Sequence, residues 1–441
     1  MTVLIVGAGI VGLCSARFLL EEGVRDVTVV EGAQAAGLGT SFANGALMHP
    51  SAVEPWNSPG ILGHVLRHLG REDASVLLRL RAVPSLLGWG LHFVRESAPA
   101  RFRANALANT ALALHSLRCM DRIRRDDTSF DRHAGGSLLV CRDRASLQAT
   151  LEWGEVLAGA GVAQRVLDVD GLVAAEPALA PIAHRLAGGI HNLDDVSGDC
   201  HRFCLDLVAQ LQAAGVRLRF GEPISSLVKT GDRVSGVRLA TGEGLAADAV
   251  VLAAGPHSVQ LAAGAGLRLP VRPAKGYSLT YELGAHDAQG GLAPTSPRLP
   301  VIDRSLHVAM TPLGAGHVRR LRVAGTAEFC GDDLRIQPER TANLERLAAQ
   351  VYPSLLQAPG AASPRAWAGL RPMCADGRPL IGPTRLGGLY LNTGHGHLGW
   401  TVAAASGELL ARLLARPSTG SQTGTPDGPR AADFAPSRFG L

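Results

Sequence analysis

The N-terminal segment combines an apolar run, Val3–Val6, with three glycines in the spacing Gly-x-Gly-x-x-Gly, a helix-like stretch and a second apolar run that ends at Glu31. This is the pattern of a strand–turn–helix–strand unit. Glycines let the turn close tightly, let a pyrophosphate approach the backbone, and let the helix pack near the strand. The helix N-terminus then offers N–H groups to phosphate, and an acid after the second strand can bind ribose hydroxyls. We therefore predict a dinucleotide site that involves Gly7, Gly9, Ile10, Val11, Gly12 and Glu31.

A second glycine-rich turn lies near the other end of the chain, after the apolar segment Leu389–Leu391. NAD and FAD share the N-terminal fingerprint, so that turn alone does not choose between them. A fingerprint at the extreme N-terminus combined with a C-terminal strand-to-helix turn favours a flavoprotein, because the helix 401–414 would aim its N-terminal amides at the pyrimidine end of a flavin. The alternative is a flexible glycine loop. The predicted contacts are Gly394, His395, Gly396, His397, Leu398, Gly399, Trp400 and Thr401.

Composition limits the other classes of function. The chain has 441 residues, enough for two or three domains, and a net charge of only +5 without a dense basic block, which does not favour nucleic-acid binding. Its seven cysteines are mostly isolated, so we expect reduced thiols, no metal site and a cytoplasmic protein. Nothing resembles a signal peptide, and no apolar run reaches the roughly 18 residues that a membrane span needs.

The order of predicted elements indicates an α/β fold with two interleaved domains. We expect a Rossmann-type FAD-binding domain that is discontinuous in sequence, and an α+β substrate-binding domain built on an antiparallel sheet. The predicted FAD-binding segments are 1–50, 170–262 and 364–416. The predicted substrate-binding segments are 51–169 and 263–363, and the Pro/Ser/Thr/Gly-rich residues 417–441 read as a mobile tail.

Several separated motifs resemble the small, catalytic subunit of bacterial D-amino-acid dehydrogenase, within the wider D-amino-acid oxidase and glycine oxidase family. The resemblance covers nearly the whole chain. The most specific motifs are Gly369–Met373 with Asp376-Gly377, and Leu391–Thr401. The others are Val3–Gly9, Thr40–Gly45, Glu54–Trp56, Glu176–Leu179, Lys275–Thr280, Thr326–Glu328 and Phe434–Arg438.

The resemblance implies non-covalently bound FAD and oxidation of an amino acid at its α-carbon by hydride transfer to the flavin. The product would be an imine that hydrolyses to a 2-oxo acid and ammonia, and the electrons would pass to a quinone or another carrier. Four alternatives stay open: a dehydrogenase or oxidase for glycine or a cyclic imino acid such as D-proline or hydroxyproline, dioxygen as acceptor, a non-catalytic flavin-carrying subunit, and a nicotinamide-dependent hydroxyacid dehydrogenase.

For the substrate site, Arg371 is the predicted carboxylate anchor, because arginine binds a carboxylate through two parallel hydrogen bonds. The alternative is a structural ion pair. Tyr277 is predicted to donate a second hydrogen bond, to cover the flavin or to pack in the core. His49 and His307 stand in segments that depart from the family pattern, and we expect them to line the substrate pocket or to be ordinary hydrogen-bonded histidines. Further predicted flavin contacts are Ser41, Asn44, Gly45, Ala46, Ile224, Ala254 and Gly255.

The apolar, tryptophan-bearing segment 86–94 is flanked by Arg79, Arg81 and Arg95. Such a stretch is typical of a surface that contacts a membrane peripherally. The stronger expectation is an interior helix of the substrate domain. The resemblance keeps peripheral contact with the inner membrane open, because the family passes electrons to the respiratory chain.

Overall fold

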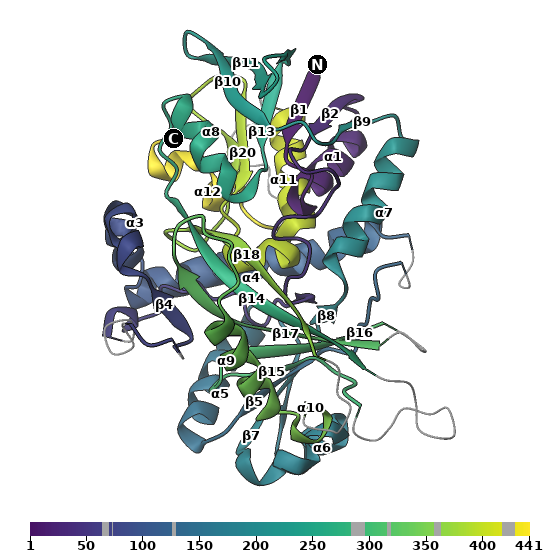
Figure 1. The fold of residues 1–441 in the computed structure, drawn as a ribbon, viewed down its shortest axis with the longest axis vertical. Helices are drawn as coiled ribbons and strands as arrows, with labels where there is room; N and C mark the ends of the chain where they lie inside the picture. The colour runs from purple at the N-terminus through teal and green to yellow at the C-terminus, as the bar shows by residue number, and fades with distance from the viewer. Residues whose placement is uncertain are drawn as a thin grey trace.

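The computed structural model describes residues 1–63, 70–72, 74–125, 129–283, 296–314, 319–356, 363–416 and 428–441. Two sheets lie at opposite ends of the molecule, with helices packed around each (Figure 1). The mixed α/β fold therefore agrees with the predicted class.

The first unit is a six-stranded sheet in which the strands run parallel except at one edge. The edge strand β19 pairs antiparallel with β20. In spatial order the strands are β19 (Leu380–Pro383), β20 (Leu389–Thr393), β13 (Ala249–Leu252), β1 (Thr2–Val6), β2 (Asp26–Val30) and β9 (Arg217–Arg219).

Both faces of this sheet are buried, as is usual for parallel strands. Val3 and Ile5 of β1 belong to one core, and Leu4 and Val6 to the other. The first core is covered by α1 (Ile10–Glu21), α7 (Cys200–Ala213) and α11 (Gly399–Ala415). The second is covered by α8 (Ser258–Gly264) and a three-stranded sheet of β10 (Ile224–Thr230), β11 (Arg233–Leu239) and β12 (Gly244–Ala246).

The second unit is a nine-stranded, mostly antiparallel sheet. Its strands are β18 (Arg365–Cys374), β14 (Val271–Leu283), β17 (Arg319–Phe329), β16 (Val308–Leu313), β15 (Val301–Asp303), β5 (Ser137–Cys141), β7 (Gly188–Asn192) and β6 (Gln164–Leu167), with β4 (Val76–Leu78) paired to β17. Its helices include α5 (Arg144–Gly159), α6 (Val169–Ala175), α9 (Pro338–Ala349) and α10 (Pro353–Leu356). A small ladder of β3 (Leu47–Met48) and β8 (Val196–Ser197) lies apart.

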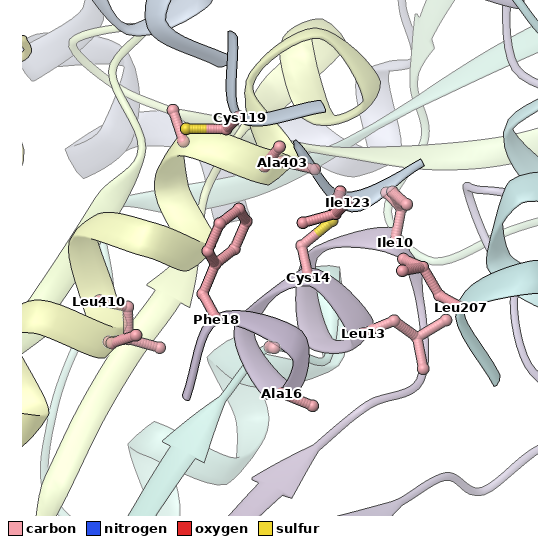
Figure 2. Close-up of a cluster of buried hydrophobic side chains, with 14 of the residues drawn as sticks. Ile10, Leu13, Cys14, Ala16, Phe18, Cys119, Ile123, Leu207, Ala403 and Leu410 are labelled. Carbon is pink, nitrogen blue, oxygen red and sulfur yellow. The ribbon is translucent and has the colours of Figure 1, made fainter. Parts of the chain in front are cut away.

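The sheets divide the chain differently from the predicted segments. β7 and β18 lie in segments expected to bind FAD, yet hydrogen bonds place both in the second sheet. The long helix α4 (Pro99–Ile123) was expected in the substrate domain, but it packs on the first unit. Figure 2 shows Cys119 and Ile123 of α4 in the same cluster as Phe18 of α1 and Ala403 of α11. The buried apolar residues of α4 from Leu112 to Ile123 belong to this same core.

The prediction of a mobile tail is wrong for residues 428–441. Residues 417–427, which were also predicted to belong to it, lie outside the described residues. The final segment forms α12 (Ala431–Phe434) and a 3-10 turn, η5 (Pro436–Phe439). Phe434 is fully buried in the first core. Arg438 forms an ion pair of 2.8 Å with Asp376, a buried carboxylate whose pKa this arginine helps to lower against the opposing effect of burial. Burial and pairing therefore fix this end of the chain.

The expectation of an interior helix at 86–94 is also wrong. α3 (Val83–Arg95) lies at the edge of the molecule (Figure 1), and Trp89 is its one buried residue. Leu87 and Leu91 are 64% and 76% exposed. No helix in the described part of the chain is long and apolar enough to cross a membrane.

Candidate functional site

A cavity of about 2010 Å³ is lined by residues from both units. Ordinary small-ligand pockets measure roughly 300–1,000 Å³. This cavity therefore has room for a dinucleotide together with a small substrate. Both glycine-rich turns contribute to its wall.

The N-terminal turn has the geometry that the fingerprint predicts. Gly7 has φ +106°, and a Cβ there would lie 2.7 Å from the Ala253 carbonyl oxygen; a Cβ on Gly12 would lie 1.9 Å from the Gly7 oxygen. These two glycines are required by the packing of the protein itself. A Cβ on Gly9 would meet only the Ser41 hydroxyl, at 3.5 Å. Gly9 lines the cavity, so the space beside it suits the close approach of a pyrophosphate.

Glu31 follows β2 and lines the cavity near this turn. Its carboxylate accepts hydrogen bonds from the backbone N–H groups of Ala8 at 2.8 Å and Ala33 at 2.9 Å. The Ile10 N–H at the start of α1 donates to the Ser41 hydroxyl at 3.1 Å. Glu31 therefore holds the turn in shape and keeps free lone pairs for a ribose.

The C-terminal turn follows β20 and continues through a 3-10 turn, η4 (Gly396–Leu398), into α11. His395, Gly396, His397, Gly399 and Trp400 line the cavity, so the N-terminus of α11 faces it. Among the described residues, the cavity wall also includes Ile224, Ala254 and Gly255, which the sequence analysis predicts to contact the flavin.

Some predicted flavin contacts support the wall from behind instead of forming it. Leu398 is 1% exposed within the first core, and Thr401 accepts a hydrogen bond from the His49 N–H at 3.3 Å. The predicted contacts that do not line the cavity, each occupied by packing or by hydrogen bonds of the fold, are Gly12, Ala46, Gly394, Leu398 and Thr401.

The loop that contains Ser41, Asn44 and Gly45 crosses from the first unit to the second. Three side chains of the second sheet bind its carbonyl oxygens. The Ser278 hydroxyl donates to Ala43 at 2.6 Å, the Arg322 guanidinium to Asn44 at 2.9 Å and the Thr311 hydroxyl to Gly45 at 2.8 Å. The second sheet thus fixes the position of a loop that is predicted to pass alongside the flavin. Ala46 takes φ +56° at the end of this loop.

Arg371 of β18 lines the cavity and forms no ion pair with any described carboxylate. Its guanidinium lies over Gly276, where a Cβ would come within 2.1 Å of Nη1, and 5.4 Å from the centre of the Trp56 ring. Nη1 donates a long hydrogen bond of 3.4 Å to the Thr326 carbonyl. Burial lowers the pKa of Arg371 to about 10. A cation held in this way has unused donors for an anionic group.

Two histidines lie beside Arg371. The His397 ring stacks at 5.5 Å on Trp56 and at 6.4 Å on His49. Burial lowers the pKa of His49 to about 4 and that of His397 to about 3, with His49 and Arg371 contributing to the second shift. Both rings are therefore neutral near pH 7. His49 Nδ1 is buried and has no hydrogen-bond partner among the described residues.

The other predicted tyrosine and histidines do not lie beside Arg371 in the same way. Tyr277 is 1% exposed and donates its hydroxyl to Glu328 at 2.8 Å, so the prediction that it binds the substrate carboxylate is corrected. Glu328 also pairs with Lys275 at 3.3 Å, and this buried network explains the orientation. His307 lies on the cavity wall in an exposed turn with φ +52°. His395 lines the cavity, but its Nε2 contacts the Ser406 hydroxyl at 3.2 Å.

Some residues on the cavity wall near Arg371 were not predicted from the sequence. Trp56 was noted only as part of a motif, although it stacks against His397 and Arg371. Thr326 takes φ +53°, and its buried hydroxyl has no partner among the described residues. The motif 326–328 is the sequence feature that could have marked Thr326 as a site residue. The positive φ of Thr326 is not visible in the sequence. The cavity wall also includes Glu54, Trp153 and Arg304, which no sequence pattern marked as site residues.

Comparisons with known proteins agree with this geometry. A family model described as FAD dependent oxidoreductase matches residues 2–413. The chain is 41% identical over 430 residues to a D-amino acid dehydrogenase of Paramagnetospirillum magneticum, covering 96% of this chain and 97% of the relative. It is 40% identical over 419 residues to a D-amino acid dehydrogenase of Dechloromonas aromatica, covering 94% and 97%.

Solved structures share the fold. L-proline dehydrogenase from P. horikoshii superposes with a TM-score of 0.71 at 17% identity, covering 99% of this chain and 97% of that one. Glycine oxidase from Geobacillus kaustophilus has a TM-score of 0.68 at 21% identity, with 94% of each chain covered.

Proposed function

The chain belongs to the FAD-dependent oxidoreductase family, and on that premise we propose that it oxidises D-amino acids at the α-carbon. The product is an imine, which hydrolyses to a 2-oxo acid and ammonia. The observation that carries this proposal is Arg371, a cation that pairs with no carboxylate of the described residues and lies on the wall of the cavity that both glycine turns border. Relatives about 40% identical over nearly the whole chain are named D-amino acid dehydrogenase, which supports the choice of substrate.

The residues divide the work of binding and orientation. Arg371 binds the substrate carboxylate through two parallel hydrogen bonds, which fixes the direction of the α-carbon. His49 and His397 stay neutral, so they add no positive charge beside the substrate amine. Bound FAD supplies the hydride acceptor.

Gly9, the amides at the start of α1 and Glu31 are the residues that we propose hold the pyrophosphate and ribose. Asn44, Gly45 and the N-terminus of α11 are proposed to border the flavin ring. The helix N-terminus favours negative charge there.

We further propose that the electrons pass to a quinone and that the protein contacts a membrane peripherally. The support is α3, whose exposed leucines form an apolar stripe with Leu80, which is 75% exposed. Arg81 and Arg95 flank this stripe, and both are exposed. An apolar face with basic flanks suits an anionic bilayer.

The membrane proposal is tested by sedimentation with vesicles that contain phosphatidylglycerol. Replacing both Leu87 and Leu91 with glutamate is expected to reduce the bound fraction severalfold. Leu205→Glu is the matched control, because Leu205 is 47% exposed on α7. Equal binding by all forms would rule out α3 as the contact.

The reaction is tested by anaerobic absorbance of the purified holoenzyme with a panel of D-amino acids, their L-enantiomers, glycine and both prolines. D-amino acids are expected to bleach the flavin, and the L-enantiomers to leave it oxidised. Bleaching by glycine or a cyclic imino acid alone would reassign the substrate. A flavin that none of them reduces would contradict the proposed oxidation.

A further inference from the structure

A smaller cavity, of about 480 Å³, lies apart from the one that Arg371 borders, and the two share no lining residue among those described. Its volume is that of an ordinary small-ligand pocket. Arginines dominate its charged wall, five of them against two carboxylates: Arg95, Arg101, Arg268, Arg378 and Arg438, with Glu96 and Asp376. The cavity therefore carries an excess of three positive charges, which suits an anionic ligand.

Contacts between distant segments hold this cavity together beside α3. The Arg272 guanidinium at the start of β14 donates from Nε to the Ser85 carbonyl of α3 at 2.7 Å. The His92 ring of α3 meets the edge of the Phe439 ring, with 6.0 Å between the ring centres. The Arg438 guanidinium lies 5.0 Å from the centre of the same Phe439 ring. α3 is therefore docked against both the start of β14 and the C-terminal segment.

The two carboxylates of the cavity are already paired within the fold. Glu96 accepts a hydrogen bond from Arg101 at 2.7 Å. Asp376 pairs with Arg378 at 3.1 Å and with Arg438 at 2.8 Å. Each acid is thus neutralised by at least one arginine, and the positive excess remains in the cavity.

Two arginines of the wall offer donors that the fold does not use. Arg95 lies at the end of α3, and Arg268 precedes β14. Both are exposed, and neither forms a hydrogen bond or an ion pair with any residue that the structure describes. A guanidinium presents its N–H groups in a planar fork that matches the oxygens of a phosphate group. The free donors of the cavity therefore suit a phosphate or a phosphodiester.

The apolar face of α3 leads to the same cavity. Leu87, Leu91 and Arg95 follow one another at intervals of four residues, so they lie along one face of the helix, and all three are exposed. Because the rise is about 1.5 Å per residue, Arg95 lies about 6 Å beyond Leu91 along the helix axis. A ligand that contacts the leucines with an apolar chain can therefore reach Arg95 with an anionic head group.

We propose that this cavity binds the head-group phosphate of an anionic phospholipid such as phosphatidylglycerol, while Leu87 and Leu91 contact the acyl region. The inference rests on the proposed peripheral membrane contact and deepens it, because it assigns a lipid class and a cavity to that contact. The positive excess disfavours the quaternary ammonium group of phosphatidylcholine. A soluble phosphate would meet the arginines but would gain nothing from the leucines.

Vesicle sedimentation with two lipid compositions tests the site. The holoenzyme is compared with the double variant Arg95→Gln/Arg268→Gln, which removes the two unpaired arginines and leaves the paired ones in place. The wild type is expected to bind vesicles that contain phosphatidylglycerol more tightly than vesicles of phosphatidylcholine alone. The double variant is expected to bind the anionic vesicles roughly 30-fold more weakly and to keep its dye-linked activity in solution.

A matched control separates the cavity from general electrostatic attraction. Arg144→Gln/Arg165→Gln removes the same charge from exposed positions of α5 and β6 in the second unit. This control is expected to bind both kinds of vesicle as the wild type does. Equal losses in the two double variants would show that only net charge matters and would overturn the site.

A short-chain lipid separates the head group from the bilayer. Dihexanoyl phosphatidylglycerol, kept below its critical micelle concentration, is titrated into the holoenzyme by calorimetry. Saturable binding to the wild type and its loss in Arg95→Gln/Arg268→Gln are expected. Inorganic phosphate is expected to bind more weakly, because it has no apolar part to contact α3. Equal affinity for inorganic phosphate would assign the cavity to a soluble anion, and the absence of saturable lipid binding would refute the site.

The two measurements distinguish failure of the head-group site from failure of the membrane contact. A wild-type protein that sediments equally with both kinds of vesicle would overturn the head-group site and keep the contact through α3. A wild-type protein that sediments with neither would refute the membrane contact, and the calorimetric titration would then decide the head-group site by itself.

Discussion

Arg371→Leu provides the sharpest test of the anchor, because the structure predicts opposite effects on binding and on stability. Burial lowers the pKa of Arg371 from the ordinary value of an arginine to about 10. Each pKa unit corresponds to about 1.4 kcal/mol, so holding this cation in the substrate-free protein costs at most about 3 kcal/mol. Partial exposure of the side chain reduces this figure. Replacement by leucine should therefore leave the free energy of unfolding unchanged or raise it by about 1–2 kcal/mol.

Substrate binding should change in the other direction. Removing one partner of a desolvated, hydrogen-bonded charge pair costs about 2–5 kcal/mol, which corresponds to a rise in KM of roughly 30-fold to several thousand-fold. Arg371→Lys keeps the charge but loses the second parallel hydrogen bond, so an intermediate KM is expected. Steady-state assays give KM, urea unfolding of the holoenzyme gives stability, and the absorbance spectrum shows that FAD is retained. A KM within threefold of the wild type, or a clear loss of stability, would refute the reasoning.

Two further substitutions test the position of Arg371 and a separate buried carboxyl. Gly276→Ala places a methyl group where the Arg371 guanidinium lies, since a Cβ there would be 2.1 Å from Nη1. The KM for the substrate should rise at least tenfold while the protein remains folded. An unchanged KM would show that the guanidinium is not held over Gly276. Asp195 is fully buried, and burial raises its pKa to about 7 despite hydrogen bonds from Ser51 and Ser137. Its contribution to the free energy of unfolding is fully present below about pH 4 and is lost as the pH rises through about 7. In Asp195→Asn this loss, which amounts to at most about 4 kcal/mol in the wild type, should disappear. Urea unfolding across this range measures the slope, and an unchanged slope in the variant would exclude Asp195.

The sequence was sufficient for features that depend on local patterns. The Gly7–Gly12 turn, the strand before it and Glu31 were predictable because glycine spacing, apolar periodicity and a terminal acid act within one short segment. The turn that starts at Gly394 was predictable for the same reason. Arg371 was identified as a candidate because a recognisable motif surrounds it, and the structure then placed it on the cavity wall without an ion-pair partner among the described residues.

Features that depend on pairing between distant segments were not predictable. The hydroxyl of Tyr277 is directed to Glu328, about fifty positions away, because the register between β14 and β17 brings them together. The apolar stripe of α4 does not reveal that its partner is α11 and not the second sheet. The composition of α3 is that of a core helix, so only the fold shows that its leucines lie on the surface.

The connection between the anchor and the C-terminal turn explains why these two motifs belong together. β18 carries Arg371 in the second sheet, and two residues later Met373 forms a β-bridge with His395 of the turn. A short, hydrogen-bonded piece of backbone therefore joins the proposed carboxylate anchor to the turn that leads into α11, whose start lines the cavity. Hydride transfer requires reacting atoms about 3–3.5 Å apart, and flexible loops between the two sites would not hold such a separation. The bridge fixes the backbone of β18 relative to the C-terminal turn, which would hold Arg371 at a constant distance from a flavin bound as we propose.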